Sequence, residues 1–103
     1  MKKTILATFA IISLNVNALD LEDCKSIEML STVIMKSRQN NVLMSKIIDV
    51  SIAHGNIKAL KPVIIDAYNQ PVFATENYKQ QAISKFSNKW FLECYKVAGG
   101  AEQ

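Results

Sequence analysis

The side chains that could do acid–base or metal chemistry are few in this 103-residue chain, and they lie far apart. The single histidine, His54, precedes Gly55, and we interpret it as a solvated residue near a helix C-terminus rather than as a general base. The adjacent Glu22 and Asp23 would point to different parts of a helix surface. Three further carboxylates are isolated in sequence: Asp49, Asp66 and Glu93. We therefore expect no enzyme, no metal site and no cofactor. The remaining alternative is a cryptic enzyme whose carboxylates meet only in the fold.

Two cysteines, Cys24 and Cys94, are the other reactive side chains. An even count in an exported chain predicts a disulfide, and two cysteines allow one pairing. The bond would close a loop of about 71 residues, worth roughly 4 kcal/mol of stability on the chain-entropy model. The pair lacks the Cys-x-x-Cys spacing of redox sites, so we expect a structural role. The acidic Glu22 and Asp23 before Cys24 are unlike the small residues of a lipidation site.

The first 18 residues have the three-part layout of a secretory signal peptide. They begin with the positive Lys2 and Lys3, and residues 5–14 form an apolar run. Val16 and Ala18 then present small side chains to a signal peptidase. The apolar run is shorter than the roughly 20 residues of a membrane-spanning helix. We therefore expect cleavage near Ala18, a periplasmic or secreted protein, and no stable membrane anchor after cleavage.

Cleavage would also remove most of the net charge. Without Lys2 and Lys3, the 12 basic residues become 10 against nine acidic ones, so the net charge falls from +3 to +1. Nucleic-acid binding usually needs a strongly basic face, so no nucleic acid is expected. The remaining chain is rich in aliphatic residues and poor in glycine and proline, which is typical of a folded chain. We predict a single helical domain over residues 19–98 and a disordered tail over residues 99–103.

The spacing of apolar residues predicts helices along the whole domain. A first helix covers residues 20–39 and ends at Asn40-Asn41, because asparagine tolerates left-handed backbone. A second covers residues 43–53 and ends at Gly55, and Asn56 caps a third, which Pro62 should kink or break. The expected apolar stripe of the first helix is Cys24, Ile27, Leu30 and Ile34, widened by Met29, Val33 and Met35. The expected inner face of the second is Met44, Ile47, Ile48, Ser51 and Ile52.

The last helix has the clearest pattern, beginning after a Thr75 cap and ending at Gly99-Gly100. Its apolar residues fall within one arc of roughly 100°. They are Ile83, Phe86, Trp90, Cys94 and Val97. Because Cys24 and Cys94 both lie on buried arcs, the terminal helices should pack side by side. We predict an all-α fold, a small bundle of four to five helices with one disulfide joining the first and last helices.

The outer side of the last helix is the candidate partner-binding surface. Basic residues beside aromatic residues are typical of protein-binding surfaces. The basic side chains and Tyr78 fall within about 40° on the helical wheel, and Phe91 and Tyr95 flank the buried arc. Alternatively, Phe91 and Tyr95 pack against the third helix and the lysines form a solvated face. The candidate residues are Tyr78, Lys85, Lys89, Phe91, Leu92, Tyr95 and Lys96.

Several short strings along the chain carry a resemblance. They are Ile34-Met35, Arg38-Gln39, Val42, Met44-Ser45, Asp66-Ala67-Tyr68, Pro71, Phe86 and Cys94. These strings resemble a group of small secreted proteins common in bacteriophage and prophage genomes, over residues 24–96. Members often have glycine before the valine, where this chain has Asn41, which can adopt the same backbone. The resemblance implies origin and location rather than an activity. In overall design alone, the chain is also similar to the Spackle protein of T-even phages, a helical periplasmic protein with one disulfide that inhibits a tail lysozyme.

These features together predict an exported, non-catalytic protein-binding module encoded by a phage or prophage. The expected partner is another protein, a periplasmic or incoming phage protein such as a lysozyme-like enzyme, which the module would inhibit in the manner of superinfection exclusion. A disulfide suits this role because pre-organisation lowers the ordering cost of binding. The alternatives are a periplasmic chaperone or stress protein, and an antiholin or immunity component at the inner membrane.

Overall fold

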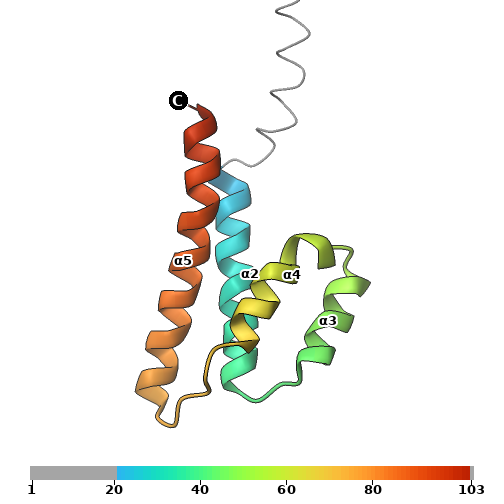
Figure 1. Ribbon diagram of the computed structural model, residues 1–103, viewed down its shortest axis with the longest axis vertical. Helices are drawn as coiled ribbons and strands as arrows, with labels where there is room; N and C mark the ends of the chain where they lie inside the picture. Colours follow the sequence, from blue (N-terminus) through green and yellow to red (C-terminus); the bar gives the residue numbers. More distant parts are fainter. Residues whose placement is uncertain (1–20, 103) are drawn as a thin grey trace, which may run out of the picture.

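The computed structural model describes residues 21–102, with side chains up to Ala98. The predicted signal peptide, residues 1–18, lies outside the described residues. The described part contains four helices and no strand, which confirms the all-α prediction (Figure 1). The helices are α2 (Leu21–Gln39), α3 (Met44–Ala53), α4 (Ile57–Tyr68) and α5 (Glu76–Glu102). No helix in this part of the chain is long and apolar enough to cross a membrane.

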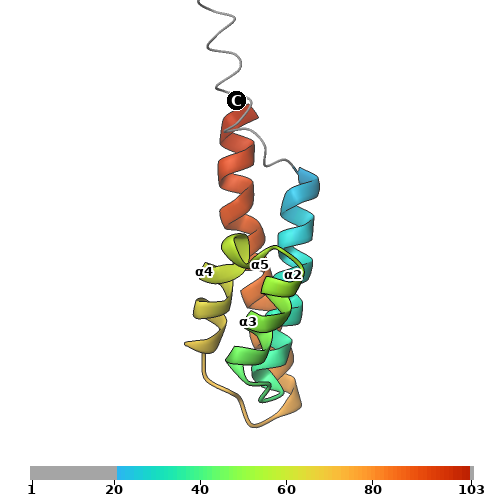
Figure 2. The same ribbon diagram turned by 90° about the vertical axis from the view of Figure 1, so that its right-hand side faces the viewer.

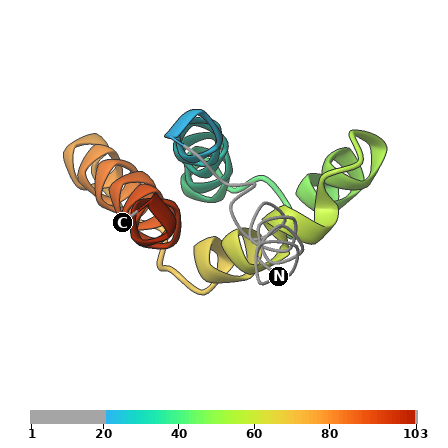
Figure 3. The ribbon, with the colours of Figure 1, turned by 90° about the horizontal axis from the view of Figure 1, so that it is seen from above.

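Helices α2 and α5 run antiparallel and side by side (Figures 1 and 2). Seen from above, α4 lies between α5 and α3, and α2 sits to one side of this row (Figure 3). The main core forms where α2, α4 and α5 meet. Its buried residues are Ile34, Met35, Leu60, Val63, Ile64, Ala67, Ile83 and Phe86. Helix α3 covers this core from one side only, through half-buried Met44, Ile47 and Ile48.

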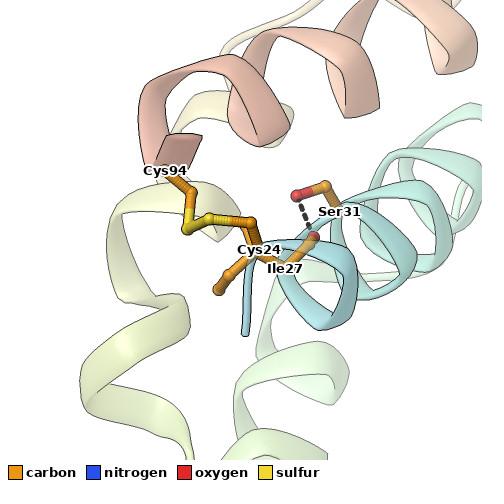
Figure 4. The surroundings of a disulfide bond; sticks show 4 residues. All are labelled: Cys24, Ile27, Ser31 and Cys94. Carbon is orange, nitrogen blue, oxygen red and sulfur yellow. Dashed lines mark hydrogen bonds between the residues drawn. A yellow bond between two sulfur atoms is a disulfide. The ribbon is translucent and has the colours of Figure 1, made fainter. Parts of the chain in front are cut away.

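A second, smaller cluster surrounds the disulfide between α2 and α5 (Figure 4). Cys24 and Cys94 are joined, with their Cα atoms 5.5 Å apart, which confirms the predicted pairing. Ala98 is buried beside them, and the half-buried Ile27 and Phe91 pack against the cluster. The bond therefore clamps the first and last described helices together near the N-terminus of α2.

Two helices end in the same hydrogen-bonded pattern, as expected from the sequence. After α2, Asn41 has a positive φ of 63°, and the Val42 N–H donates to the Ser37 carbonyl at 3.0 Å. After α3, Gly55 has a φ of 75°, and the Asn56 N–H donates to the Ser51 carbonyl at 3.0 Å. Both are Schellman motifs, which satisfy the last carbonyls of a helix by one left-handed residue.

Helix α4 departs from the sequence-based expectation at two positions. It is continuous through Pro62, so of the predicted kink or break, the break into two pieces does not occur. A proline inside a helix removes one backbone donor, but the buried side chains along α4 hold this helix against the core. Asn56 is the N-cap residue, as predicted, yet its side chain makes no cap hydrogen bond. Its Oδ1 is a buried oxygen with no hydrogen-bond partner within the described chain.

Four side chains expected inside the bundle are exposed. Met29 and Val33 on α2 and Ile52 on α3 lie on faces that no other helix of the described chain covers. On α5, Val97 is 51% exposed and Ala98 is buried instead. At this end α5 extends beyond the level of α4 (Figure 1), and the contact of its buried Ala98 is with the disulfide cluster of Cys24 and Cys94. Ala98, one turn after Cys94, therefore continues the contact of α5 with α2.

The last helix is also longer than expected. It continues through Gly99 and Gly100 to Glu102, so the predicted helix end at these glycines is wrong. A glycine inside a helix costs about 1 kcal/mol relative to alanine, which weakens a helix without ending it. The Thr75 prediction is confirmed, because the Tyr78 N–H donates to Thr75 Oγ1 at 3.2 Å.

Candidate protein-binding surface

The outer face of α5 carries exposed aromatic and aliphatic side chains along most of the helix. Tyr78, Leu92 and Tyr95 are each about half exposed. Tyr95 stacks on Phe91, with the ring centroids 6.0 Å apart and the planes 9° from parallel. Tyr78 makes a tilted contact with Phe73, at 6.3 Å between ring centroids. These contacts fix the orientation of both tyrosine rings while leaving each with a solvent-facing side.

Phe91 lies between the exposed face of α5 and the disulfide cluster and is not itself fully exposed. Its ring is half-buried and packs against the disulfide cluster of Cys24, Cys94 and Ala98. Phe91 packs against the disulfide cluster that joins α2 and α5, and Tyr95 is about half exposed. The alternative interpretation has both rings against the third helix and the lysines as a solvated face, and Lys85, Lys89 and Lys96 are indeed exposed. The stack of Phe91 and Tyr95 thus connects the exposed face of α5 to the disulfide cluster.

The lysines of this face have different surroundings. Lys89 Nζ lies 2.6 Å from Asp66 Oδ2 on α4, and Lys96 Nζ lies 3.4 Å from Glu93 Oε2 one turn away. Lys85 has no hydrogen bond or ion pair within the described chain. It lies with Lys89 at the edge of a hollow of about 200 Å³, whose wall includes Phe73. Lys85 is therefore the cation of this face that is most available to a partner.

Asp66 is a structural residue that the sequence did not reveal. Its Oδ2 also accepts a hydrogen bond from Trp90 Nε1 at 2.9 Å, and its Oδ1 accepts one from Gln70 Nε2 at 3.0 Å. Burial raises the pKa of the Asp66 carboxyl, but the bonds from Lys89 and Trp90 and the Lys89 charge outweigh it, so the pKa is lowered. Trp90 and Asp66 are 24 residues apart, so no local pattern could have paired them.

A second network ties the loop between α4 and α5 to the end of α2. The buried Gln39 donates through Nε2 to the Pro71 carbonyl at 2.8 Å and accepts the Phe73 N–H at Oε1, at 2.9 Å. Lys79 Nζ donates to the Gln39 carbonyl at 2.8 Å. These bonds satisfy backbone groups of an irregular loop that would otherwise be buried without partners. These hydrogen bonds therefore fix the loop, and with it the start of α5, beside the C-terminal end of α2.

The neighbouring Arg38 and Tyr68 complete this end of the molecule. Arg38 Nε donates to the Gln70 carbonyl at 2.9 Å, and its guanidinium lies 5.4 Å from the Tyr68 ring centroid. Tyr68 donates its hydroxyl to the Val42 carbonyl at 2.6 Å. Burial raises the pKa of the Tyr68 phenol, and the Arg38 charge lowers it by less, so the net shift is upward.

A separate apolar groove lies between α2, α3 and α4, away from the residues predicted for binding. Its volume is about 210 Å³. The residues that form most of its walls are Leu30, Val33, Ile47, Val50 and Leu60. His54 lines one part of it, with Nδ1 3.0 Å from the Val50 carbonyl. Within the described residues, no three His, Cys, Asp or Glu side chains lie close enough together to hold a metal ion.

Six of the seven predicted residues are exposed, and Phe91 is half-buried. The six are Tyr78, Lys85, Lys89, Leu92, Tyr95 and Lys96. Lys89 is engaged by Asp66, and Phe91 packs on the disulfide. The resemblance to small phage proteins stays a prediction, because comparison with known protein families, curated proteins and solved structures found no match for this chain.

Proposed function

We propose that this chain is an exported, non-catalytic protein-binding module, encoded by a phage or prophage, that inhibits a periplasmic or incoming phage protein such as a lysozyme-like enzyme. The outer face of α5 makes the contact. The observation that carries the proposal is a set of half-exposed side chains along α5, beside Lys85, which has no ion pair or hydrogen bond within the described chain. These side chains are Tyr78, Leu92 and Tyr95. The opposite side of α5 packs against α2 and is joined to it by the disulfide. Aromatic anchors next to a cation are enriched at protein interfaces.

The disulfide supports both the location and the mode of action. Structural disulfides persist in oxidising compartments such as the periplasm, in agreement with the predicted signal peptide. The bond also joins the binding helix covalently to α2 at Cys94, between Leu92 and Lys96. A surface held in its binding conformation loses less entropy when it associates, which favours a tight inhibitor.

The charge of the face fits the proposed class of target. Glycoside hydrolases, lysozymes included, place two catalytic carboxylates in the cleft that holds the sugar chain. Lys85 and Lys89 at the rim of an apolar-walled hollow complement such a cleft electrostatically. The unpaired Lys85 is expected to contribute more than Lys89, whose charge is already shared with Asp66.

The test combines capture with an inhibition assay. The protein is used to capture partners from periplasmic extracts of infected and uninfected cells, and the captured enzyme is then assayed for clearing of a peptidoglycan suspension. We expect one stoichiometric partner, inhibited by the protein. Lys85→Glu and Leu92→Asp should abolish both capture and inhibition, whereas Ile65→Asp, an exposed aliphatic position on α4, should change neither.

Three results would overturn the proposal. Unchanged capture by Lys85→Glu and Leu92→Asp would show that the outer face of α5 is not the contact. A broad range of unfolded clients would identify a chaperone. Capture of a partner from membrane fractions alone would identify an antiholin or immunity component.

A further inference from the structure

The groove between α2, α3 and α4 exposes apolar side chains on both of its edges. Val33 on α2 is 53% exposed, and Val50 on α3 is 51% exposed. Met29 lies one helical turn from Val33 and is 62% exposed. Leu60 from α4 is buried and belongs to the floor. Exposed apolar residues on two facing helices, above an apolar floor, form a continuous surface that water solvates poorly.

The size and shape of this groove favour a protein segment as its occupant. Its volume of about 210 Å³ is below the roughly 300–1,000 Å³ of pockets that enclose a whole small molecule. It is open rather than enclosed, and α2 and α3 lie on the same side of α4 (Figure 3). A helix laid between α2 and α3 would cover Val33 and Val50 and insert one or two side chains toward Leu60. This is the helix-in-groove mode of recognition.

The charges beside the groove are mainly basic. Lys36 follows Val33 by three residues on α2, and Lys46 precedes Val50 by four on α3, so each lies within one helical turn of an apolar edge. Neither lysine has an ion pair within the described chain. The carboxylates nearest in sequence are Glu28, which is half-buried, and Asp49, which points about 100° away from Val50 around α3.

We propose that this groove binds an amphipathic helix of a partner protein, with an apolar face that enters the groove and acidic residues on its flanks. Lys36 and Lys46 pair with those acidic residues, one from each side, and Val33 and Val50 pack against the apolar face. The groove lies across the molecule from the outer face of α5, so the proposal does not depend on the proposed function. A module with two such surfaces can join two proteins.

The test uses the full chain with its disulfide intact and two fluorescein-labelled peptides of about 18 residues, five helical turns each. Both peptides carry the same leucine face, one with glutamate flanks and the other with lysine flanks. Fluorescence anisotropy should show saturable binding of the acidic peptide, at least about tenfold tighter than that of the basic peptide. Lys46→Glu, an exposed position that leaves the core intact, should reverse this preference.

A matched pair of α3 variants locates the contact. Val50→Asp should weaken binding of the acidic peptide by about tenfold or more. Ile52→Asp places the same charge on the same helix, at a side chain that is 57% exposed and outside the groove, and should leave binding unchanged. Lys85→Glu on α5 should also leave it unchanged, which separates this surface from that of the proposed function. Far-ultraviolet circular dichroism confirms that each variant is folded.

Several outcomes overturn the proposal. Equal affinity for both peptides, or an equal loss with Val50→Asp and Ile52→Asp, would rule out a specific acidic helix in the groove. Binding to phosphatidylglycerol vesicles that is lost in Val50→Asp, without peptide binding, would assign the groove to a membrane surface. Dimerisation in light scattering that is lost in Val50→Asp would assign it to a second copy of this chain.

Discussion

Asp66 shows how one side chain can position a helix. It receives hydrogen bonds from Lys89 and Trp90 on α5 and from Gln70 beyond the end of α4. Asp66→Ala should lower the free energy of unfolding by about 2 kcal/mol, because bonds to a charged acceptor are lost and the Trp90 N–H loses its partner. Lys89→Ala should cost less than about 1 kcal/mol, because the lysine is half exposed. Urea denaturation followed by circular dichroism measures both. An equal loss in the two variants would contradict the role given to Trp90.

The lowered pKa of Asp66 predicts a pH dependence of a definite sign. The folded state holds the carboxylate more strongly than the unfolded state, so its stabilisation is present at neutral pH and is lost as pH falls through the folded pKa. Asp66→Asn should therefore be less stable than the natural protein near neutral pH, and the difference should shrink toward zero in acid. Denaturation curves of both proteins across acid pH measure this difference. A gap that stays constant with pH would contradict it.

Gln39 is expected to contribute more to stability than any exposed polar residue. Gln39→Ala leaves the Pro71 carbonyl and the Phe73 N–H without their partners, which predicts a loss of about 2–4 kcal/mol. Gln80→Ala removes an exposed hydrogen bond to Glu76 and should cost less than about 0.5 kcal/mol. The same denaturation experiment compares them, and similar losses in the two variants would argue against the loop network.

Several residues of the strings that we compared above with small phage proteins have structural roles in this chain. Arg38 and Gln39 bind the loop after α4, and Tyr68 donates to the backbone after α2. Asp66 positions α5. The sequence displays these residues but not their partners, most of which lie 23 to 40 residues away. In this chain, these residues thus join the helices to one another and to the loop after α4.

At the scale of single elements, the ends of α2 and α3 could be predicted from the sequence because their causes are local. Gly55 and Asn41 both occupy the left-handed position of a Schellman motif. A Cβ added at Gly55 meets nothing within 4 Å, so backbone strain alone opposes a larger residue. Gly55→Ala should therefore cost about 1–2 kcal/mol, and Gly55→Asn less, because asparagine tolerates this backbone. Thermal unfolding of the two variants measures the order, and equal losses would contradict it.

The faces of the helices were only partly predictable from the sequence, because periodicity shows which side is apolar but not how far a neighbouring helix extends. Val97 lies on the predicted arc of α5, yet it is exposed, and α5 extends beyond the level of α4 at its C-terminal end (Figure 1). Val33 continues the stripe of α2 but lies beside the open groove. Neither outcome has a local cause. The groove itself, built from three separate elements, could not be inferred from any one of them.

At the scale of the whole molecule, the disulfide decides how firmly the two longest helices stay together. It joins residues 70 apart in sequence, so it removes many open conformations from the unfolded chain. The Cys24→Ser, Cys94→Ser double variant should be less stable by roughly 4 kcal/mol on the chain-entropy model. For a domain whose total stability is of the order of 5–15 kcal/mol, this is a large share.

The Cys24→Ser, Cys94→Ser double variant should also lower the local stability of some segments more than that of others. Beyond Cys94, the buried residue of α5 among those with described side chains is Ala98, which packs with Cys24 and Cys94, whereas the core of α2, α4 and α5 does not involve the cysteines. Hydrogen exchange should therefore speed up most in residues 95–102 and around residues 21–27, and much less at Ile64 and Phe86. Reducing agent should reproduce this pattern in the natural protein and leave the double variant unchanged. An equal increase of the exchange rate along the whole chain would show instead that the disulfide acts on global unfolding alone. The helix ends around Cys24 and Cys94 would then be no less stable than the core.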